Sequence, residues 1–178
     1  ISEIVARLIV NRDISSNDQL KQYINPSLEY MYNPLKMKDL EKTCDILLNK
    51  IKQEKTIRII GDYDVDGVMS TYILYTALKK CGAKVDYEIP DRIKDGYGIN
   101  IDIINEAFDE KIDTIITCDN GIAALEQVKY AKQQGITVLI TDHHDIPFIG
   151  EGNEKHFNLP EGDAIVNPKQ EDCHYPYK

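Results

Sequence analysis

Short apolar runs and longer amphipathic stretches alternate along the chain from residue 56 onward. Five runs rich in β-branched residues predict strands at residues 57–60, 85–89, 114–118, 137–141 and 164–166. Between most of them lie stretches with helical spacing, which predict helices at residues 68–81, 101–108 and 122–134. Strands that alternate with helices predict an α/β fold. We expect a mostly parallel, five-stranded, doubly wound (Rossmann-like) sheet with helices on both faces.

Residues 1–55 have a helical pattern and no obvious chemical motif. Residues 40–51 have the spacing of an amphipathic helix, and Pro26 and Pro34 interrupt the pattern before it. We therefore expect a helical N-terminal segment at residues 1–55, followed by an α/β domain at residues 56–178.

The composition is that of a soluble globular protein. Hydrophobic residues make up 42% of the 178 residues and charged residues 29%, and no apolar run approaches the roughly 20 residues that a membrane span needs. The four cysteines form no CxxC pair, which indicates a reducing, cytoplasmic setting. The chain begins at Ile1 rather than Met, so we expect a piece of a longer protein.

The formal net charge of -9 narrows the possible functions. It argues against a protein that coats duplex DNA through a broad basic surface. It is compatible with a nucleic-acid enzyme, because such an enzyme gathers carboxylates around metal ions and can bind phosphates locally.

Acidic residues and paired histidines follow three of the predicted strands. The first strand is followed by GDYDVDG (residues 61–67), the third by DNG (residues 119–121) and the fourth by DHHD (residues 142–145). In an open α/β sheet, ligands bind outside the carboxyl ends of the strands. We therefore expect these three motifs to meet at one functional site.

The first motif is typical of a metal-binding loop. Alternate residues of an extended chain point the same way, so we expect Asp62, Asp64 and Asp66 to converge. Three carboxylates this close repel one another unless cations intervene, and Mg²⁺ or Mn²⁺ is the natural solution. Gly67 then lets the chain turn tightly into a helix, whose amino end favours an anion such as phosphate.

Three other interpretations of this motif compete. An EF-hand loop that starts at Asp62 would need a bidentate Glu at its twelfth position, which is Ile73 here. A solvated acidic turn is costly directly after a buried strand. An aspartyl-phosphate enzyme would use Asp62 or Asp64 as its nucleophile.

The second and third motifs indicate a functional site mainly because they lie at strand ends beside the first motif. Taken alone, an aspartate after a strand, such as Asp119, is at least as typical of a turn or a helix cap as of a metal ligand. In the third motif, adjacent histidines at an extended strand end point in different directions. We therefore expect either His143 or His144 to bind a metal ion while the other faces the substrate, with Asp142 orienting a histidine. A pair of exposed loop histidines is the alternative.

Together, residues 61–67, 119–121 and 142–144 resemble the first three motifs of the DHH phosphoesterase superfamily. Residues 89–98 and 159–168, with the ending at 173–178, are similar to its RecJ-type branch of single-strand-specific exonucleases. The resemblance implies a two-metal phosphodiesterase that uses Mn²⁺ or Mg²⁺. Members of this branch remove nucleotides from the 5′ end of single-stranded DNA in repair and recombination.

The resemblance also assigns roles to individual residues. It implies Asp64, Asp66 and His143 as metal ligands, Asp119 as the ligand that bridges two ions, and His144 as the contact to the scissile phosphate. A carboxylate is suited to bridging, because it can offer one oxygen to each of two ions about 3.5–4 Å apart.

The chain departs from the family pattern in two places. Some relatives carry a histidine where this chain has Ile60. Asp62 is therefore a further catalytic candidate, either as a replacement ligand or as a residue behind the ligands. The family also uses an Asp in a fourth motif and a C-terminal domain (DHHA1-like) with a glycine-rich phosphate-binding motif. We expect residues 56–178 to be an incomplete DHH catalytic domain, and a non-catalytic binding fragment is the alternative.

Arg92 and Asn120 are the candidate substrate contacts. A guanidinium can grip a DNA phosphate with two hydrogen bonds, although a surface ion pair of Arg92 with Asp91 or Asp95 is an equal alternative. Tyr97 is expected either to pack or to stack on a base. The expected partners are single-stranded DNA and a helicase or single-strand-binding protein, with no membrane. Short oligoribonucleotides, cyclic dinucleotides and pyrophosphate remain alternative substrates.

Overall fold

The computed structural model describes residues 2–94, 96–150 and 156–177, and it divides the chain into two compact units. The first, Ile1–Asn33, contains α1 (Glu3–Val10), α2 (Asn17–Ile24) and the 3-10 turn η1 (Leu28–Tyr30). A capping box between Ser16 and Gln19 starts α2, since each residue satisfies a free backbone N–H group of that turn.

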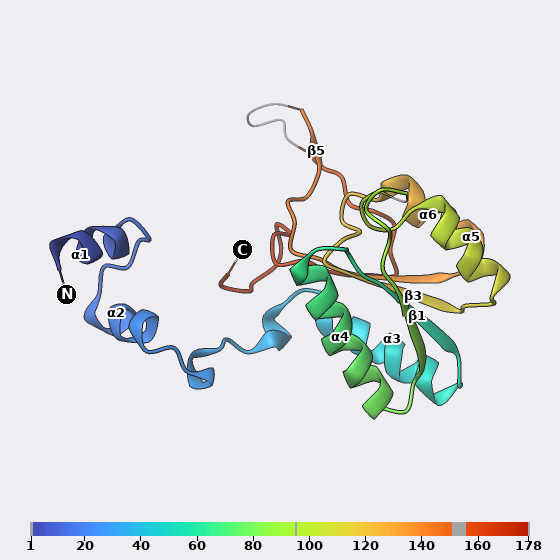
Figure 1. Ribbon diagram of the computed structural model, residues 1–178, viewed down its shortest axis with the longest axis horizontal. Helices are drawn as coiled ribbons and strands as arrows, with labels where there is room; N and C mark the ends of the chain where they lie inside the picture. Colours follow the sequence, from blue (N-terminus) through green and yellow to red (C-terminus); the bar gives the residue numbers. More distant parts are fainter. Residues whose placement is uncertain (1, 95, 151–155, 178) are drawn as a thin grey trace. The chain divides into compact units, whose positions relative to one another are not determined.

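The second unit, Pro34–Lys178, contains a five-stranded sheet in the order β2-β1-β3-β4-β7, in which every pair is parallel (Figure 1). Its strands are β1 (Thr56–Ile60), β2 (Lys84–Glu88), β3 (Thr114–Cys118), β4 (Thr137–Thr141) and β7 (Ala164–Val166). Its helices are η2 (Pro34–Lys36), α3 (Leu40–Lys52), α4 (Val65–Lys80), α5 (Ile101–Asp109) and α6 (Leu125–Gln133).

Helices cover both faces of the sheet. Successive strand residues point to opposite faces, so each strand contributes side chains to both helical layers. Ile57 and Ile59 of β1 pack with Leu47 of α3 and Leu78 of α4. Ile60 packs on the other face in the cluster formed by α5 and α6. The central strand β3 is buried along its whole length, as expected for a parallel strand between two helical layers.

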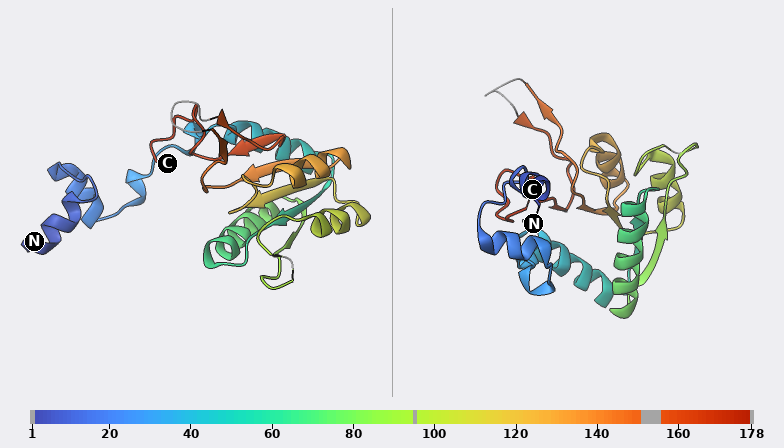
Figure 2. Two further views of the ribbon diagram at one scale, coloured as in Figure 1. Left: turned by 90° about the horizontal axis from the view of Figure 1, so that it is seen from above. Right: turned by 60° about the vertical axis from the view of Figure 1, so that its left-hand side comes forward.

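The predicted fold class is confirmed, and all five predicted strands are present within one residue of their expected ends. Two helix starts were wrong, since α4 begins at Val65 rather than residue 68 and α6 begins at Leu125 rather than residue 122. A short antiparallel hairpin of β5 (Phe148–Ile149) and β6 (His156–Phe157) was not expected. It projects away from the sheet (Figure 2).

Helix α3 belongs to the sheet-containing unit, where Leu47 enters the core. A compact unit and a functional domain are different divisions of a chain, so the domain boundary at residues 55–56 stays a prediction. No helix in the described ranges has both the length and the apolar character that crossing a membrane demands.

Candidate active site

The loop after β1 carries two of the candidate carboxylates. Asp64 caps α4, because its side chain accepts a hydrogen bond from the Gly67 N–H at 2.9 Å. Asp62 is 2% exposed, and its Oδ1 atom has no hydrogen-bond partner among the described residues. A Cβ atom on Gly67 would lie 2.5 Å from the backbone oxygen of Asp62. Only glycine therefore lets the first turn of α4 approach Asp62 so closely.

Asp119, directly after β3, has a left-handed backbone conformation with φ of 62°. Its N–H donates to the Thr141 carbonyl at 3.0 Å, which ties the end of β3 to the end of β4. Its own carbonyl accepts a hydrogen bond from the Tyr97 hydroxyl at 3.1 Å. Non-glycine residues in this conformation are strained and gather at functional sites. These contacts hold the Asp119 side chain at the carboxyl edge of the sheet.

The Asn120 side chain is fully buried and joins three parts of this edge. Its Nδ2 donates to the carbonyls of Ile60 and Cys118, both at 3.0 Å, and its Oδ1 accepts from the Ile99 N–H at 3.3 Å. We expected Asn120 to bind substrate. In this structure both polar atoms of its side chain bind the backbone, so a substrate contact would require these bonds to break.

Asp142, after β4, organises the two histidines from a side chain that is 1% exposed. Its Oδ1 accepts hydrogen bonds from the N–H groups of His143 and His144, at 2.7 and 3.1 Å, and lies 2.7 Å from the Nδ1 atom of His144. Its Oδ2 accepts from the Ile122 N–H at 2.9 Å. Asp142 therefore orients the His144 ring and also joins it to the segment ahead of α6.

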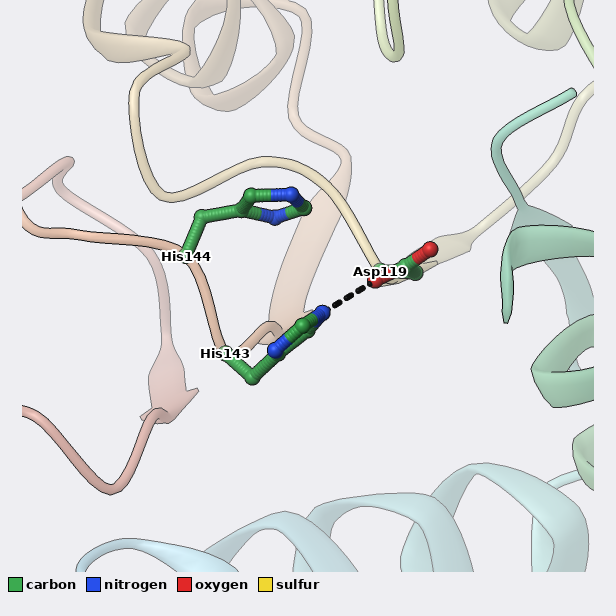
Figure 3. Close-up of side chains that lie close together, drawn as sticks. All are labelled: Asp119, His143 and His144. Atoms are coloured by element: carbon green, nitrogen blue, oxygen red, sulfur yellow. Dashed lines mark hydrogen bonds and ion pairs between the residues drawn. The ribbon is translucent and has the colours of Figure 1, made fainter. Parts of the chain in front are cut away.

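The two histidines do not diverge, so the expectation from an extended chain was wrong. Two successive N–H groups bind one oxygen of Asp142, and this bends the chain after β4. The ring centroids of His143 and His144 lie 4.7 Å apart. The Nε2 atom of His143 lies 2.8 Å from the Oδ1 atom of Asp119 (Figure 3). Both histidines therefore have a ring nitrogen close to Asp119.

Asp119 belongs to two groups of possible metal ligands among the described residues. Ligand atoms of Asp62, Asp64 and Asp119 all lie within 4.8 Å of one another, and the same holds for Asp119, His143 and His144. The Asp119 carboxylate is thus shared between an all-oxygen group and a group with two imidazoles. Two ions bridged by one carboxylate require such sharing.

The electrostatics of these groups fit a hard divalent cation. Burial and the charge of Asp64 raise the pKa of Asp119, against the hydrogen bond with His143. The partnerless Oδ1 atom of Asp62 is a buried acceptor, which is costly unless a donor or cation satisfies it. Clustered carboxylate oxygens are the ligands that Mg²⁺ and Mn²⁺ prefer. The residues present therefore fit the expected metal ions.

The surroundings of His144 favour its protonated form. Burial alone would lower its pKa, but the hydrogen bond with Asp142 and the charges of Asp142 and Asp119 outweigh burial and raise it. Burial and the nearby carboxylates also raise the pKa of Tyr97, so its hydroxyl keeps its proton and remains a donor.

Asp66 lies outside both ligand groups. Because α4 begins at Val65, Asp66 sits in the first helical turn, and the alternation of an extended loop does not carry it toward Asp62. It lines a depression together with Asp119 and His143. Asp66 is thus close to the site, but the structure does not group it with the other ligands as the sequence pattern predicted.

Arg92 lies beside the site rather than in it. Its guanidinium lies over the Tyr63 ring, 5.3 Å from the ring centroid, an arrangement that favours a cation–π interaction. Asp91 uses its carboxylate to accept hydrogen bonds from the N–H groups of Ile93 and Lys94. The other expected ion-pair partner, Asp95, lies outside the described residues.

Tyr97 was expected either to pack or to stack on a base, but its contacts with Asp119 and His144 were not expected. Its hydroxyl lies 3.1 Å from the Asp119 carbonyl and 3.3 Å from the Nδ1 atom of His144. Its ring meets the His144 ring edge-to-face, with centroids 5.9 Å apart. The only sequence signal was its position between Gly96 and Gly98, which both have positive φ and turn the chain toward the site.

Comparisons with known proteins identify the relatives of this chain. The chain is 39% identical over all its 178 residues to the single-stranded-DNA-specific exonuclease RecJ of Bacillus subtilis, and it covers 22% of that protein. Among solved structures, a manganese-bound exonuclease RecJ matches 78% of this chain and 33% of its own, with 33% identity and a TM-score of 0.66. The Mn²⁺ complex of RecJ from Thermus thermophilus matches 94% of this chain and 24% of its own, with 25% identity and a TM-score of 0.64.

The RecJ proteins of Bacillus subtilis, Haemophilus influenzae and Escherichia coli each match at least 98% of this chain. The chain covers only 22% to 28% of their own length. The sequence model described as the DHH family, N-terminal domain, matches residues 56–174, which include all three strand-end motifs. By this match, which covers more than half of the chain, the chain belongs to the DHH family.

Proposed function

We propose that this chain carries most of the active site of a metal-dependent phosphodiesterase that hydrolyses single-stranded DNA from the 5′ end, in DNA repair and recombination. The observation that carries the proposal is the sharing of Asp119 between two groups of possible ligands. The substrate is supported by the names of the relatives, which describe single-stranded-DNA-specific exonucleases.

The proposed cofactors are two divalent ions, Mn²⁺ or Mg²⁺, with Asp119 between them. Asp64 would bind on the carboxylate side and His143 on the imidazole side, since their ligand atoms lie within 4.8 Å of those of Asp119. Asp66 is the proposed additional ligand, because it lines the same depression as Asp119 and His143. When bound, the ions supply Lewis acidity that activates water and stabilises charge on the attacking and leaving oxygens.

Asp62 is the proposed replacement for the histidine that some DHH relatives carry at the position of Ile60. The Ile60 side chain is fully buried in the core and offers no ligand atom. Asp62, two residues further, has a buried oxygen without a partner among the described residues and lies within ligand distance of Asp64 and Asp119. A role as a ligand satisfies that oxygen.

His144 is the proposed contact to the scissile phosphate. Asp142 holds its Nδ1 atom, which fixes the ring, and the Nε2 atom, 3.5 Å from the Tyr97 hydroxyl, is the one proposed to face the substrate. The raised pKa of His144 favours its protonated form, which can donate to a phosphoryl oxygen as negative charge develops there. The edge-to-face contact with Tyr97 also restrains the ring.

Arg92 is the proposed contact to a DNA phosphate away from the cleavage point. Its guanidinium rests on Tyr63 beside the site, where it can present two donors to a phosphate. We also propose a cytoplasmic location and a helicase or single-strand-binding protein as partner of the whole enzyme. If short oligoribonucleotides, cyclic dinucleotides or pyrophosphate are the true substrates, the enzyme will cleave one of them faster than single-stranded DNA.

A titration of Mn²⁺ into the chain, followed by calorimetry, tests the proposal. Two binding events are expected for the unmodified protein, and Asp119→Asn should weaken both, because this carboxylate is common to both groups. Asp109→Asn is the matched control, since Asp109 is an exposed aspartate at the end of α5. Absence of binding at micromolar Mn²⁺, or equal binding by Asp119→Asn, would contradict the two-metal site. Release of mononucleotides from a 5′-labelled DNA strand tests the reaction itself.

A further inference from the structure

A second hollow opens next to His144, separate from the depression that contains Asp66 and His143. It has a volume of about 490 Å³ and lies between the segment after Tyr97 and the segment that leads into α6. Pockets that enclose small organic ligands typically have volumes of about 300–1,000 Å³. The size of the hollow therefore fits a ring-shaped organic group, and its place beside His144 connects it to the proposed reaction.

The floor of this hollow is apolar and belongs to the buried core. Ile99 and Ile122 line it and are 3% and 1% exposed, so they belong to the core as well as to the wall. Ala123 adds a small side chain at the rim, and Tyr97 adds an aromatic side. A flat apolar group buried against such a floor is stabilised by the removal of both surfaces from water.

The charges around the hollow disfavour a phosphate inside it. The lining includes the carboxylates of Asp142 and Asp145, and no lysine or arginine is among the described residues that line it. Lys169 forms an ion pair with Asp145 but does not itself line the hollow. Apart from His144, which lines one side and is the proposed phosphate contact, a phosphate inside the hollow would meet only like charges, whereas an uncharged group would not.

One polar side chain of the hollow is free to bind a ligand. Gln127 of α6 lines it, and its amide makes no hydrogen bond with any of the described residues. An amide has both donors and an acceptor, so it can bind the polar edge of an aromatic ring in more than one orientation.

We propose that this hollow binds the base of the nucleotide whose phosphate contacts His144, with the ring against Ile99 and Ile122 and its polar edge near Gln127. The inference rests on the proposed function and deepens it by assigning a base subsite. Since the floor is apolar and the amide is both donor and acceptor, purines and pyrimidines should both be accepted. The subsite would thus hold the nucleotide without selecting a sequence.

The test uses two uncharged probes, thymidine and deoxyadenosine, titrated into the ¹⁵N-labelled chain and followed by NMR. Both should shift the amide signals of Gly98, Gly121 and Ala123, which line the hollow. Deoxyribose, which lacks both base and phosphate, should leave these signals in place. Because the nucleosides carry no phosphate and need no metal ion, this readout does not depend on catalysis.

Two variants probe the hollow, and a third serves as control. Ala123→Trp should fill it and weaken nucleoside binding by about tenfold or more, which corresponds to roughly 1.4 kcal/mol. Gln127→Leu should weaken binding less, because only the polar contact is lost, and it keeps the test valid if the tryptophan variant does not fold. Ala77→Trp, at an exposed position of α4, should bind nucleosides like the unmodified chain.

The results separate this proposal from the metal site. Unshifted signals with both nucleosides, or equal nucleoside affinity in Ala123→Trp, Gln127→Leu and the unmodified chain, would overturn the base subsite while leaving the metal site intact. Asp119→Asn should lose Mn²⁺ but still bind nucleosides, because Asp119 does not line the hollow. Nucleoside binding that depends on Ala123, in a chain that binds no Mn²⁺, would support the subsite and reject the proposed reaction.

Discussion

The Oδ1 atom of Asp142 lies 2.7 Å from the Nδ1 atom of His144, and the same oxygen accepts the N–H groups of both His143 and His144. One buried carboxylate thus sets both the bend of the chain after β4 and the orientation of a ring. In the proposed reaction, Asp142 is a positioning residue, because it acts on the substrate through His144.

Asp142→Asn should lower kcat for single-stranded DNA by about 10- to 100-fold with a smaller change in KM, a range typical for residues that orient a ligand or catalytic histidine. The amide keeps one acceptor oxygen but places an NH₂ group against N–H donors. Separate measurement of kcat and KM checks this. Asp109→Asn should leave both unchanged, and an unaltered kcat in Asp142→Asn would show that the hydrogen bond has no part in catalysis.

Tyr97→Phe should reduce kcat by about tenfold, the effect of losing one positioning hydrogen bond of about 1.4 kcal/mol in the transition state. The ring and its edge-to-face contact with His144 remain, while the hydroxyl donor to the Asp119 carbonyl is lost. Thermal unfolding should change little. Tyr72→Phe on the exposed side of α4 is the matched control, and equal activity of the two variants would argue against this role of Tyr97.

Gly67→Ala should destabilise the chain and also weaken Mn²⁺ binding. Its Cβ atom would meet the backbone of Asp62 at 2.5 Å, and overpacking of this kind costs about 1–3 kcal/mol. Gly82 has a left-handed φ of 81°, and a Cβ atom there would meet nothing within 4 Å. Gly82→Ala should therefore lower the free energy of unfolding by about 1 kcal/mol and leave the Mn²⁺ affinity unchanged. Urea unfolding and Mn²⁺ titration of both variants distinguish general strain from damage to the site.

Asp113 gives the fold a pH dependence at the opposite end of β3. Burial would raise the pKa of Asp113, but hydrogen bonds with Lys50 and Thr114 and the charges of Lys50 and Lys55 lower it overall. A carboxylate with a lowered folded-state pKa contributes stability above its unfolded pKa, about 3.9, and loses it as the pH falls through the folded pKa.

Asp113→Asn should therefore lower the free energy of unfolding at pH 7 by about 1 kcal/mol or less, since its ion pair is partly exposed. The difference from the unmodified chain should shrink below about pH 4 as the carboxylate is protonated. Urea unfolding at several pH values measures it. If the difference in the free energy of unfolding stays constant between about pH 7 and about pH 3, the ion pair of Asp113 is not its cause.

The sequence predicted most of the sheet well because β1, β3, β4 and β7 are largely buried on both faces, whereas the edge strand β2 buries only Val85. Strands buried on both faces are continuous apolar runs, and β3 is buried at every position. Helix starts were less predictable, because the DVDG stretch has a loop-like composition while Asp64 in fact caps a helix that begins one residue later. The hairpin of β5 and β6 has only two residues in each strand, too few for a recognisable period.

The sequence predicted those residues of the candidate site that directly follow a strand. Asp62, Asp64, Asp119 and His143 follow parallel strands, whose carboxyl ends meet at one edge of the sheet. Apart from the bond of Asn120 to Cys118, the contacts of Asn120 and Tyr97 were not predictable, since these partners lie about 20 residues away or more along the chain. Only folding reveals which distant backbone groups such side chains reach.

The central claim is that Asp119 lies between two metal ions. Crystals of the protein grown with Mn²⁺, measured at the manganese absorption edge, test it most directly. We predict two anomalous peaks about 3.5–4 Å apart, one on each side of the Asp119 carboxylate. A single peak, or peaks that do not contact Asp119, would contradict the account.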